Sequence, residues 1–427
     1  MILLFMLLGL LALILINVPI AIALAVVATI AIVLVQGVDM LPNIGITMFE
    51  GARSFPLLAI PMFVLAGAIM NTGGISRRLI AFASALFGFI RGGLAMINIG
   101  VSMFFAEISG SAVADVAATG SVLIPAMKKR GYPKAFAAAV TSSSASLAII
   151  IPPSIPMILY GVMAGASVVQ LFVAGIVPGI LGGVGLMALS YWYARRYNWP
   201  VEEIFQLRNL WVTFKDAFWA LTLPIIILGS IFGGFVTATE GAGIAVAAAI
   251  LLSTAIYREL DLRALYRAVI DGGQQTAVVM LLVAASALVG MFLTEMRVPQ
   301  QLAGAVLDFT SNPYVILMLL NVFFLAIGMF LHSAAAIILV VPIVMPLVTA
   351  AGIDPVHFGL IVCLNLAIGQ QTPPVASVLI TACSIARADV WSVTRVNLGF
   401  IAVLLAVLML ATYVPAVPMF LVEYFYR

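Results

Sequence analysis

The chain has 427 residues, of which 64% are hydrophobic and only 8% are charged, and its formal net charge is +3. Soluble domains contain about half apolar and a quarter charged residues. This composition therefore excludes a soluble enzyme, a nucleic-acid-binding protein and a secreted disulfide scaffold. Apolar stretches of roughly 20 residues recur along the sequence, unlike the short alternating strands of a barrel. We predict an all-α polytopic protein that lies in a lipid bilayer.

The first half of the chain combines apolar spans with one hairpin and one interrupted helix. An amphipathic stretch at 75–90, with two arginines beside apolar residues, is typical of an arm at the membrane interface. Two shorter apolar helices over 92–127 are expected to form a hairpin. The helix expected at 134–160 is interrupted by Ile151-Pro152-Pro153-Ser154. The other spans are predicted at 2–16, 19–36, 55–72 and 168–194, the first of them a retained span because it lacks the basic residues of a secretory signal.

The second half predicts the same series. A polar-flanked stretch at 299–309 takes the place of the amphipathic arm, and a second helix pair over 313–350 is expected to form a second hairpin. The helix expected at 356–382 is interrupted by Thr372-Pro373-Pro374. The remaining spans are predicted at 217–235, 240–257, 275–295 and 392–422.

Proline positions recur at a nearly constant offset. Pro125 corresponds to Pro346, and Pro152-Pro153 corresponds to Pro373-Pro374, in both cases 221 residues later. Ordered matches between two halves of similar hydropathy indicate an internal repeat. We predict a first repeat over 1–200, a cytoplasmic linker over 201–216 and a second repeat over 217–427.

Charge in the loops indicates that the two repeats are inverted. If each hairpin enters and leaves on one side, five crossings per half remain, and an odd number turns the second repeat over. Cytoplasmic loops are rich in Lys and Arg. This topology places 16 of the 19 Lys and Arg inside and both termini in the periplasm. Hairpin helices that crossed separately would give the same alternation, so charge does not decide between re-entrant and crossing pairs.

The two interruptions predict a binding site. Each double proline removes two backbone donors, and irregular backbone at membrane depth persists only where protein or a water-filled cavity satisfies it. Free carbonyls and nearby hydroxyls are hard ligands that suit Na⁺, and half-helix N-termini attract an anion. Paired interruptions at matching positions are a pointer to the binding site of a transporter. The alternative is a pair of kinked helices with a purely structural role.

The hairpin tips are rich in small and polar residues. The first contains Ser109-Gly110-Ser111, and the second contains His332-Ser333. Their hydroxyls can donate to a carboxylate or bind a cation, although small residues also serve simple helix packing. Ionisable groups within the membrane are usually functional. Glu107, Asp115 and His332 are candidates of this kind, Glu240 is expected in a loop, and Cys363 and Cys383 are expected to be packing residues.

These motifs together resemble the large membrane subunit of tripartite ATP-independent periplasmic (TRAP) transporters. The resemblance covers essentially the whole chain and rests on the tip, the two breaks and several flanking motifs. It implies an elevator-type fold with two re-entrant hairpins and Na⁺-coupled uptake of an organic acid through the bacterial inner membrane. It also implies a small transmembrane subunit and a periplasmic substrate-binding protein. The motifs are Ser109–Ala112 with Asp115, Gly131-Tyr132, Ile151–Ser154, Asp354–Gly359, Thr372–Pro374 and Leu57–Pro61.

The candidate site residues come from the tips and the breaks, several of them carried over by position from the family. Many family members have an acidic residue where this chain has His332, so the second tip looks more like that of the sialic-acid (N-acetylneuraminate) branch. The expected substrate-binding residues are Ser109, Ser111, Ser154, His332 and Ser333. The expected Na⁺-binding residues are Ser109, Gly110, Ser144, Gly369, Gln371 and Thr372.

Other functions are compatible with parts of the pattern. C4-dicarboxylate uptake within the same family and a stand-alone dicarboxylate or citrate:Na⁺ symporter share this architecture. An intramembrane hydrolase could use Ser109 or Ser111 with His332 as base, but nothing orients the histidine and the nucleophile-elbow pattern is missing. A passive channel would require rings of like charge or a repeated filter. We therefore expect a transporter and not an enzyme.

Overall fold

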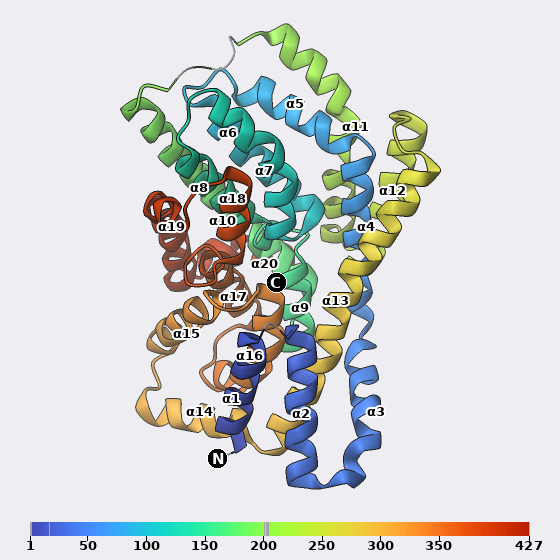
Figure 1. Ribbon diagram of the computed structural model, residues 1–427, viewed down its shortest axis with the longest axis vertical. Helices are drawn as coiled ribbons and strands as arrows, with labels where there is room; N and C mark the ends of the chain where they lie inside the picture. Colours follow the sequence, from blue (N-terminus) through green and yellow to red (C-terminus); the bar gives the residue numbers. More distant parts are fainter. Residues whose placement is uncertain (1, 17, 200, 202–204, 427) are drawn as a thin grey trace.

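The computed structural model describes residues 2–16, 18–199, 201 and 205–426. Within these ranges the secondary structure is helical, apart from an isolated β-bridge between Arg91 and Val201. Seven of the described helices are long and apolar enough to cross a membrane. The predicted all-α architecture is thus confirmed (Figure 1).

One group of helices, here called the scaffold bundle, combines the start of both repeats. In the first repeat two helices separated at Arg53–Leu58 occupy the place that one continuous helix, α13, occupies in the second. α13 packs along α2, α3 and α4, while α12 packs on α4. The scaffold bundle consists of α1 (Ile2–Leu15), α2 (Ile20–Gln36), α3 (Leu41–Ala52), α4 (Ala59–Thr72), α11 (Leu207–Phe232), α12 (Ala238–Leu251) and α13 (Leu262–Glu295).

The second group, here called the hairpin bundle, contains both hairpins and both broken helices. The half-helix after each break packs on the other repeat: α9 lies against α16 and α17, and α18 lies against α7 and α8. The two repeats therefore interlock here. The first repeat supplies α6 (Gly93–Ser109), α7 (Ala112–Lys129), α8 (Lys134–Ala145), α9 (Ile155–Ala164) and α10 (Val168–Arg196). The second supplies α15 (Pro313–Gly328), α16 (Ser333–Ala350), α17 (Pro355–Gly369), α18 (Ser377–Ala386), α19 (Val390–Tyr413) and α20 (Ala416–Tyr426).

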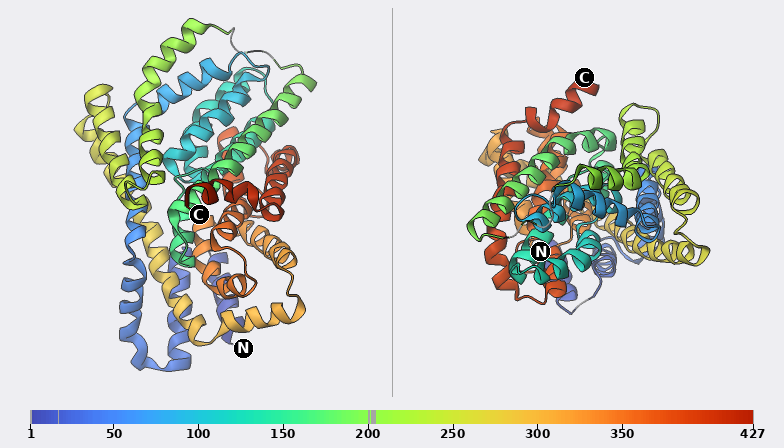
Figure 2. Two further views of the ribbon diagram at one scale, coloured as in Figure 1. Left: turned by 180° about the vertical axis from the view of Figure 1, so that it is seen from behind. Right: turned by 90° about the horizontal axis from the view of Figure 1, so that it is seen from above.

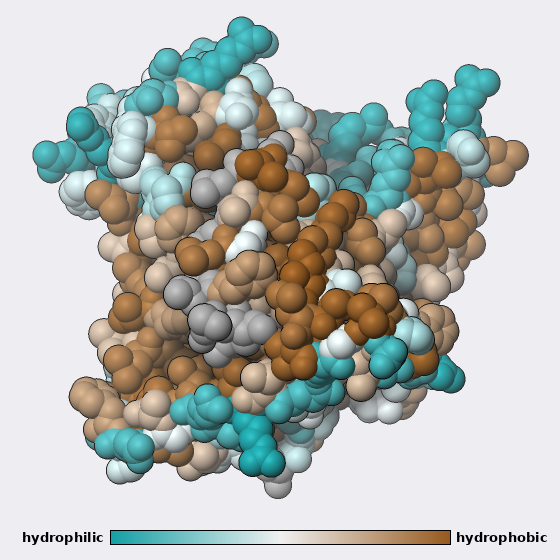
Figure 3. Space-filling view, turned by 60° about the horizontal axis from the view of Figure 1, so that its bottom comes forward, coloured by the Kyte–Doolittle hydropathy of each residue, from teal (hydrophilic) through white to brown (hydrophobic). Residues whose placement is uncertain are grey.

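Two arm helices, α5 (Ile75–Phe87) and α14 (Val298–Phe309), connect the bundles at opposite ends of the molecule (Figures 1 and 2). The hairpin α6–α7 starts and finishes at the end where α5 lies, and the hairpin α15–α16 starts and finishes at the end where α14 lies. The two repeats are therefore inverted, and both hairpins are re-entrant, as predicted. Polar side chains gather towards the ends of the molecule, with apolar side chains between them (Figure 3).

Several element boundaries differ from the prediction. The connection expected between residues 36 and 55 contains the helix α3, and α13 has 34 residues because it continues through the polar segment before residue 275. α11 begins at Leu207, inside the segment 201–216 assigned to a linker. The span expected at 392–422 is two helices, since Pro415 cannot continue α19.

Candidate functional site

The two breaks approach each other inside the hairpin bundle. The hydroxyl of Ser143, on α8, lies 2.7 Å from Oε1 of Gln371 and 2.7 Å from Oδ1 of Asn397, and it can donate to one of them at a time. Nδ2 of Asn397 lies 3.4 Å from the main-chain oxygen of Gln371. All three residues are buried. Neutral oxygens from both repeats thus converge where the second break begins.

The first break is a short 3₁₀ turn followed by irregular backbone. Ser146–Ile149 form the 3₁₀ segment, and the Pro152-Pro153 bond is cis. The hydroxyl of Ser154 donates to the main-chain oxygen of Ile149 at 2.8 Å, which closes the turn. Gly175 allows α10 to approach the main chain of this break closely, because a Cβ on that residue would lie 2.2 Å from the main-chain oxygen of Ile150.

The second break is held by the hairpin of its own repeat. A Cβ on Gly369 would lie 2.6 Å from the Cα of Gly328, so two glycines let the end of α17 meet the end of α15. The main-chain N–H of Val375 donates to the oxygen of Met329 at 3.2 Å. The Pro373-Pro374 bond is also cis.

The first hairpin tip lies on the first break. Gly110 has φ of +56°, and a Cβ there would lie 3.1 Å from the main-chain nitrogen of Ile155. Ser111 is the N-cap residue of α7, and Asp115 is fully buried in the first turn of that helix, where the helix dipole favours a carboxylate. The side chains of Ser109 and Glu107 lie outside the described part of the structure.

The second tip has the corresponding geometry. His332 is the N-cap residue of α16 and is partly exposed, while Ser333 begins the helix and is buried. Each tip therefore meets the break of its own repeat, and the N-termini of α7, α9, α16 and α18 all begin at a tip or a break.

The residues expected to bind Na⁺ lie in three places. Gly369, Gln371 and Thr372 lie together at the second break. There the main-chain oxygen of Gly369 accepts from the N–H of Thr372 at 2.9 Å, and the hydroxyl of Thr372 donates to the oxygen of Ile368 at 3.0 Å. Gly110 lies at the first tip. Ser144 is buried between α8 and α6, where the hydroxyl of Ser102 lies 2.9 Å from its own. Their role in binding Na⁺ stays a prediction.

Other candidates have simpler surroundings. Glu240 was expected in a loop but lies in the first turn of α12, where the backbone N–H and the hydroxyl of Thr237 donate to its carboxylate and cap the helix. Cys363 and Cys383 are free and buried. In the part of the chain that the structure describes, no three His, Cys, Asp or Glu side chains cluster as metal ligands.

Sequence reasoning missed a set of buried amides and hydroxyls. Nδ2 of Asn98 donates to the hydroxyl of Thr141 at 2.6 Å, which ties α6 to α8. Nδ2 of Asn365 donates to Oδ1 of Asn321 at 2.7 Å, which ties α17 to α15. In each repeat, buried polar bonds thus fix the first helix of the hairpin to the first half of the broken helix. Asn98 and Asn321 are 223 residues apart, so the repeat offset was a signal that could have found them.

Comparisons with known proteins agree with this architecture. The family described as "Tripartite ATP-independent periplasmic transporter, DctM component" matches residues 7–417. The isethionate TRAP transporter permease protein DctMQ of Oleidesulfovibrio alaskensis is 43% identical over 95% of this chain, which spans 64% of that relative's length. The sialic acid TRAP transporter large permease protein SiaM of Vibrio cholerae is 36% identical, with 88% of each chain covered.

A solved structure supports the same fold. The YdaH transporter of Alcanivorax borkumensis, whose crystal structure is described as revealing an unusual topology, superimposes with a TM-score of 0.65 at 14% identity, covering 88% of each chain. The relatives named above are transporter permeases, so this multi-pass protein of the bacterial inner membrane is not an enzyme. Because the family model matches nearly the whole chain, and the repeats, tips and breaks agree with it, the chain belongs to the DctM family, the large permease component of tripartite ATP-independent periplasmic transporters.

Proposed function

We propose that the chain is the large membrane subunit of a Na⁺-coupled secondary transporter that imports an organic acid anion. A periplasmic binding protein delivers the acid, and a small transmembrane subunit completes the membrane part. The observation that carries the proposal is the pairing of each hairpin tip with a break, in two inverted repeats whose polar groups meet at Ser143, Gln371 and Asn397.

This arrangement suits an anion and a cation together. Four helix N-termini begin at the tips and breaks, and their dipoles favour the anionic group of the substrate. The main-chain and side-chain oxygens beside them are neutral hard ligands of the kind that Na⁺ prefers. Bound Na⁺ offsets the negative charge of the acid in a region of low dielectric, where either ion alone is costly. Uptake of the acid is thereby coupled to Na⁺ entry.

Movement of the hairpin bundle against the scaffold bundle, as in an elevator, would expose the site alternately to the two sides. An apolar cavity of about 560 Å³ lies between the two bundles. It is surrounded by α1, α2 and α13 of the scaffold bundle and by α15 and α16 of the second hairpin. Leu24, Val289, Phe323 and Val340 are among its lining residues, and every lining residue is apolar. An interface without directional polar bonds at this place supports sliding, since dispersion and apolar burial depend little on register. The loop charges support periplasmic positions for both termini.

Two substrates have specific support. Sialic acid is favoured by the His332-Ser333 tip and by the relative from Vibrio cholerae named for that acid. Isethionate is favoured by the relative that is 43% identical. Both are anions with hydroxyl groups, so the same helix N-termini and serine hydroxyls could bind either. C4-dicarboxylates carry a second charge, and no arginine is among the residues that form the two tips and the two breaks.

Reconstitution tests the proposal. The chain, its small transmembrane partner and the binding protein are placed in proteoliposomes, and uptake of sialic acid, isethionate and succinate is measured with an inward Na⁺ gradient or with K⁺ alone. We expect uptake of one acid only with Na⁺ and only with the binding protein. Equal uptake in K⁺ would refute the coupling. Uptake without any binding protein would favour the stand-alone symporter instead.

A further inference from the structure

A groove lies between the arm α5 and the first turns of α11, away from the tips and breaks. It has a volume of about 680 Å³, and its floor is apolar and aromatic. The ring of Phe214 lies 5.9 Å from that of Phe82 on the arm and 5.8 Å from that of Trp211, measured between centroids. Its lining includes Phe82, Leu86, Leu207, Arg208, Trp211 and Phe214.

The edge of the groove is cationic. Arg208 belongs to its lining, and Nζ of Lys215 lies 5.3 Å from the centroid of the Trp211 ring. Among the described residues, the ion pairs involve Arg53, Arg77 and Arg78, and neither Arg208 nor Lys215 forms one. Trp211 is 56% exposed beside these two cations. The groove therefore presents an apolar floor, an open indole ring and positive charge at one rim.

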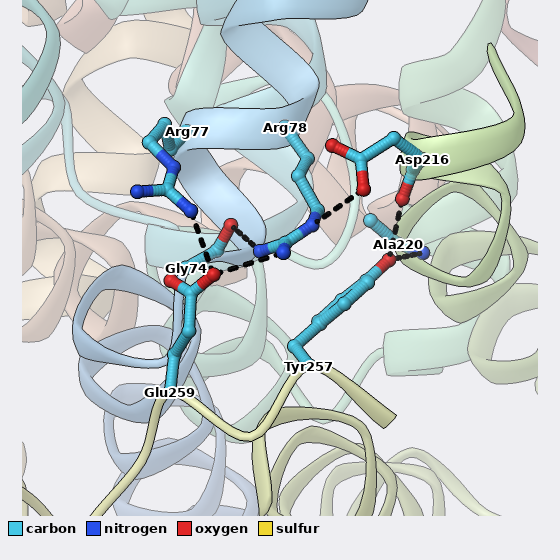
Figure 4. Close-up of polar contacts among 7 residues, drawn as sticks. All are labelled: Gly74, Arg77, Arg78, Asp216, Ala220, Tyr257 and Glu259. Carbon is cyan, nitrogen blue, oxygen red and sulfur yellow. Dashed lines mark hydrogen bonds and ion pairs between the residues drawn. The ribbon is translucent and has the colours of Figure 1, made fainter. Parts of the chain in front are cut away.

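The position of the groove along the membrane normal follows from the charged cluster next to it (Figure 4). Arg78 of α5 pairs with Glu259 at 2.8 Å and with Asp216 of α11 at 3.1 Å, and its guanidinium carbon lies 3.9 Å over the Tyr257 ring. Phe82 is one turn beyond Arg78, and Trp211 is less than two turns before Asp216. A cluster of this charge does not enter the hydrocarbon core, so the groove lies at the boundary between headgroups and acyl chains.

We propose that this groove binds an anionic phospholipid. Its acyl chain lies along Phe82, Leu86 and Phe214, and its phosphate lies between Arg208 and Lys215. Long cationic side chains extend towards headgroups while their stems cover apolar surface, and tryptophan is favoured at this depth. Basic residues near the surface attract anionic lipids, whereas a purely apolar floor would not distinguish headgroups. The bound lipid bridges the arm and the scaffold bundle, and its binding does not depend on the proposed substrate or on coupling.

Quenching of tryptophan fluorescence tests the proposal. The full chain, with any membrane partner that remains bound, is placed in nanodiscs that contain brominated phosphatidylglycerol or brominated phosphatidylcholine at equal mole fraction. The Trp211→Phe variant gives the emission of the other four tryptophans, and the difference reports Trp211. We expect the phosphatidylglycerol to quench Trp211 about threefold more strongly, since each nearby cation favours an anionic lipid several-fold.

Matched variants distinguish recognition of the lipid headgroup by the two cations from binding of the acyl chain to the apolar floor. Arg208→Gln with Lys215→Gln should bring the quenching ratio to about one, whereas Arg263→Gln with Arg267→Gln, exposed cations at the start of α13, should leave it unchanged. All four side chains are exposed, so these variants should fold. Equal quenching by the two lipids in the unmodified chain overturns the proposal. Absence of any Trp211 quenching also overturns it, because protein and not lipid would then cover the groove.

Discussion

The break around Pro152 and Pro153 is buried along its whole length, whereas the equivalent break in the second repeat reaches the surface at Pro374 and Val375. Val375 is 45% exposed, while Ile151, in the first break, is 8% exposed. Both segments join two half-helices and contain the same pair of prolines. Inverted copies of one fold thus differ in access, and only the second break is open to its surroundings in this conformation.

The support behind the two breaks differs as well. In the first repeat Gly175 brings α10 directly against the main-chain oxygen of Ile150. In the second repeat the corresponding position, 222 residues later, is Asn397, whose amide nitrogen points at the main-chain oxygen of Gln371. Backbone packing leaves no alternative arrangement, but an amide can exchange partners. The first break is therefore a rigid element, and the second is the one in which an ion could replace protein contacts.

Cysteine labelling should show the largest difference. A water-soluble maleimide should modify Val375→Cys at least roughly tenfold faster than Ile151→Cys, because a buried thiol reacts only after local opening. The native Cys363 and Cys383 are buried, so the unmodified chain serves as the background. The rates are read by mass spectrometry on the protein in nanodiscs. Similar rates at the two positions would show that both breaks are open.

The Gly175→Ala substitution should damage the rigid break. The added methyl group would lie 2.2 Å from the oxygen of Ile150, so the backbone must shift, at a cost of about 1–3 kcal/mol. We expect a fall in the midpoint of thermal unfolding and a loss of most uptake in proteoliposomes. Gly243→Ala in α12 is the matched control, since a Cβ there meets nothing within 4 Å. Equal behaviour of the two variants would contradict the close approach.

Much of this comparison could be predicted from sequence, because hydropathy indicates the spans, the proline offset indicates the repeat, and loop charge indicates its inversion. The buried amides could not. Whether Asn397 points at Gln371 depends on the packing of α19 against α8, and local hydropathy does not predict how two helices pack. The same holds for Gly175. Nothing in the sequence distinguishes it from the rest of the 35 glycines, because its close approach to Ile150 is known only from the structure. The sequence did not predict that α13 begins as early as Leu262, because the polar first turns of this helix resemble a loop.

Asn397→Leu should weaken the proposed Na⁺ binding at the second break. The substitution removes Oδ1, one of the neutral oxygens that converge there, and the amide nitrogen that lies 3.4 Å from the main-chain oxygen and from Oε1 of Gln371. Loss of a polar contact of this kind costs about 1 kcal/mol, so we expect the half-saturating Na⁺ concentration to rise about fivefold. The half-saturating substrate concentration, measured at saturating Na⁺, should change much less. Asn321→Leu is the control, since it removes a buried amide that bonds Thr412 and Asn365 away from the break. If that variant raises the Na⁺ requirement equally, general loosening explains both results and the distinct role of the second break is lost.

The two arms also differ, and the effects expected from substitutions there are the smallest. α5 is fixed by Arg78, whose side chain is 12% exposed and pairs with Asp216 and Glu259, whereas Arg77 is 73% exposed and pairs with Glu259 alone. Arg78→Gln should lower the stability of the protein by about 1–2 kcal/mol, and Arg77→Gln by less than about 1 kcal/mol, since exposed pairs contribute little.

On the opposite arm, Arg297 precedes α14 and enters none of the ion pairs found among the described residues, so Arg297→Gln should leave the unfolding midpoint unchanged. The three variants are compared by thermal unfolding at low and at high salt. Screening should reduce the Arg77 effect more than the Arg78 effect, because the Arg78 side chain is largely buried whereas that of Arg77 is exposed. A destabilisation by Arg297→Gln as large as that by Arg78→Gln would mean that both arms are fixed by charge, and the asymmetry between the repeats would then be confined to the breaks.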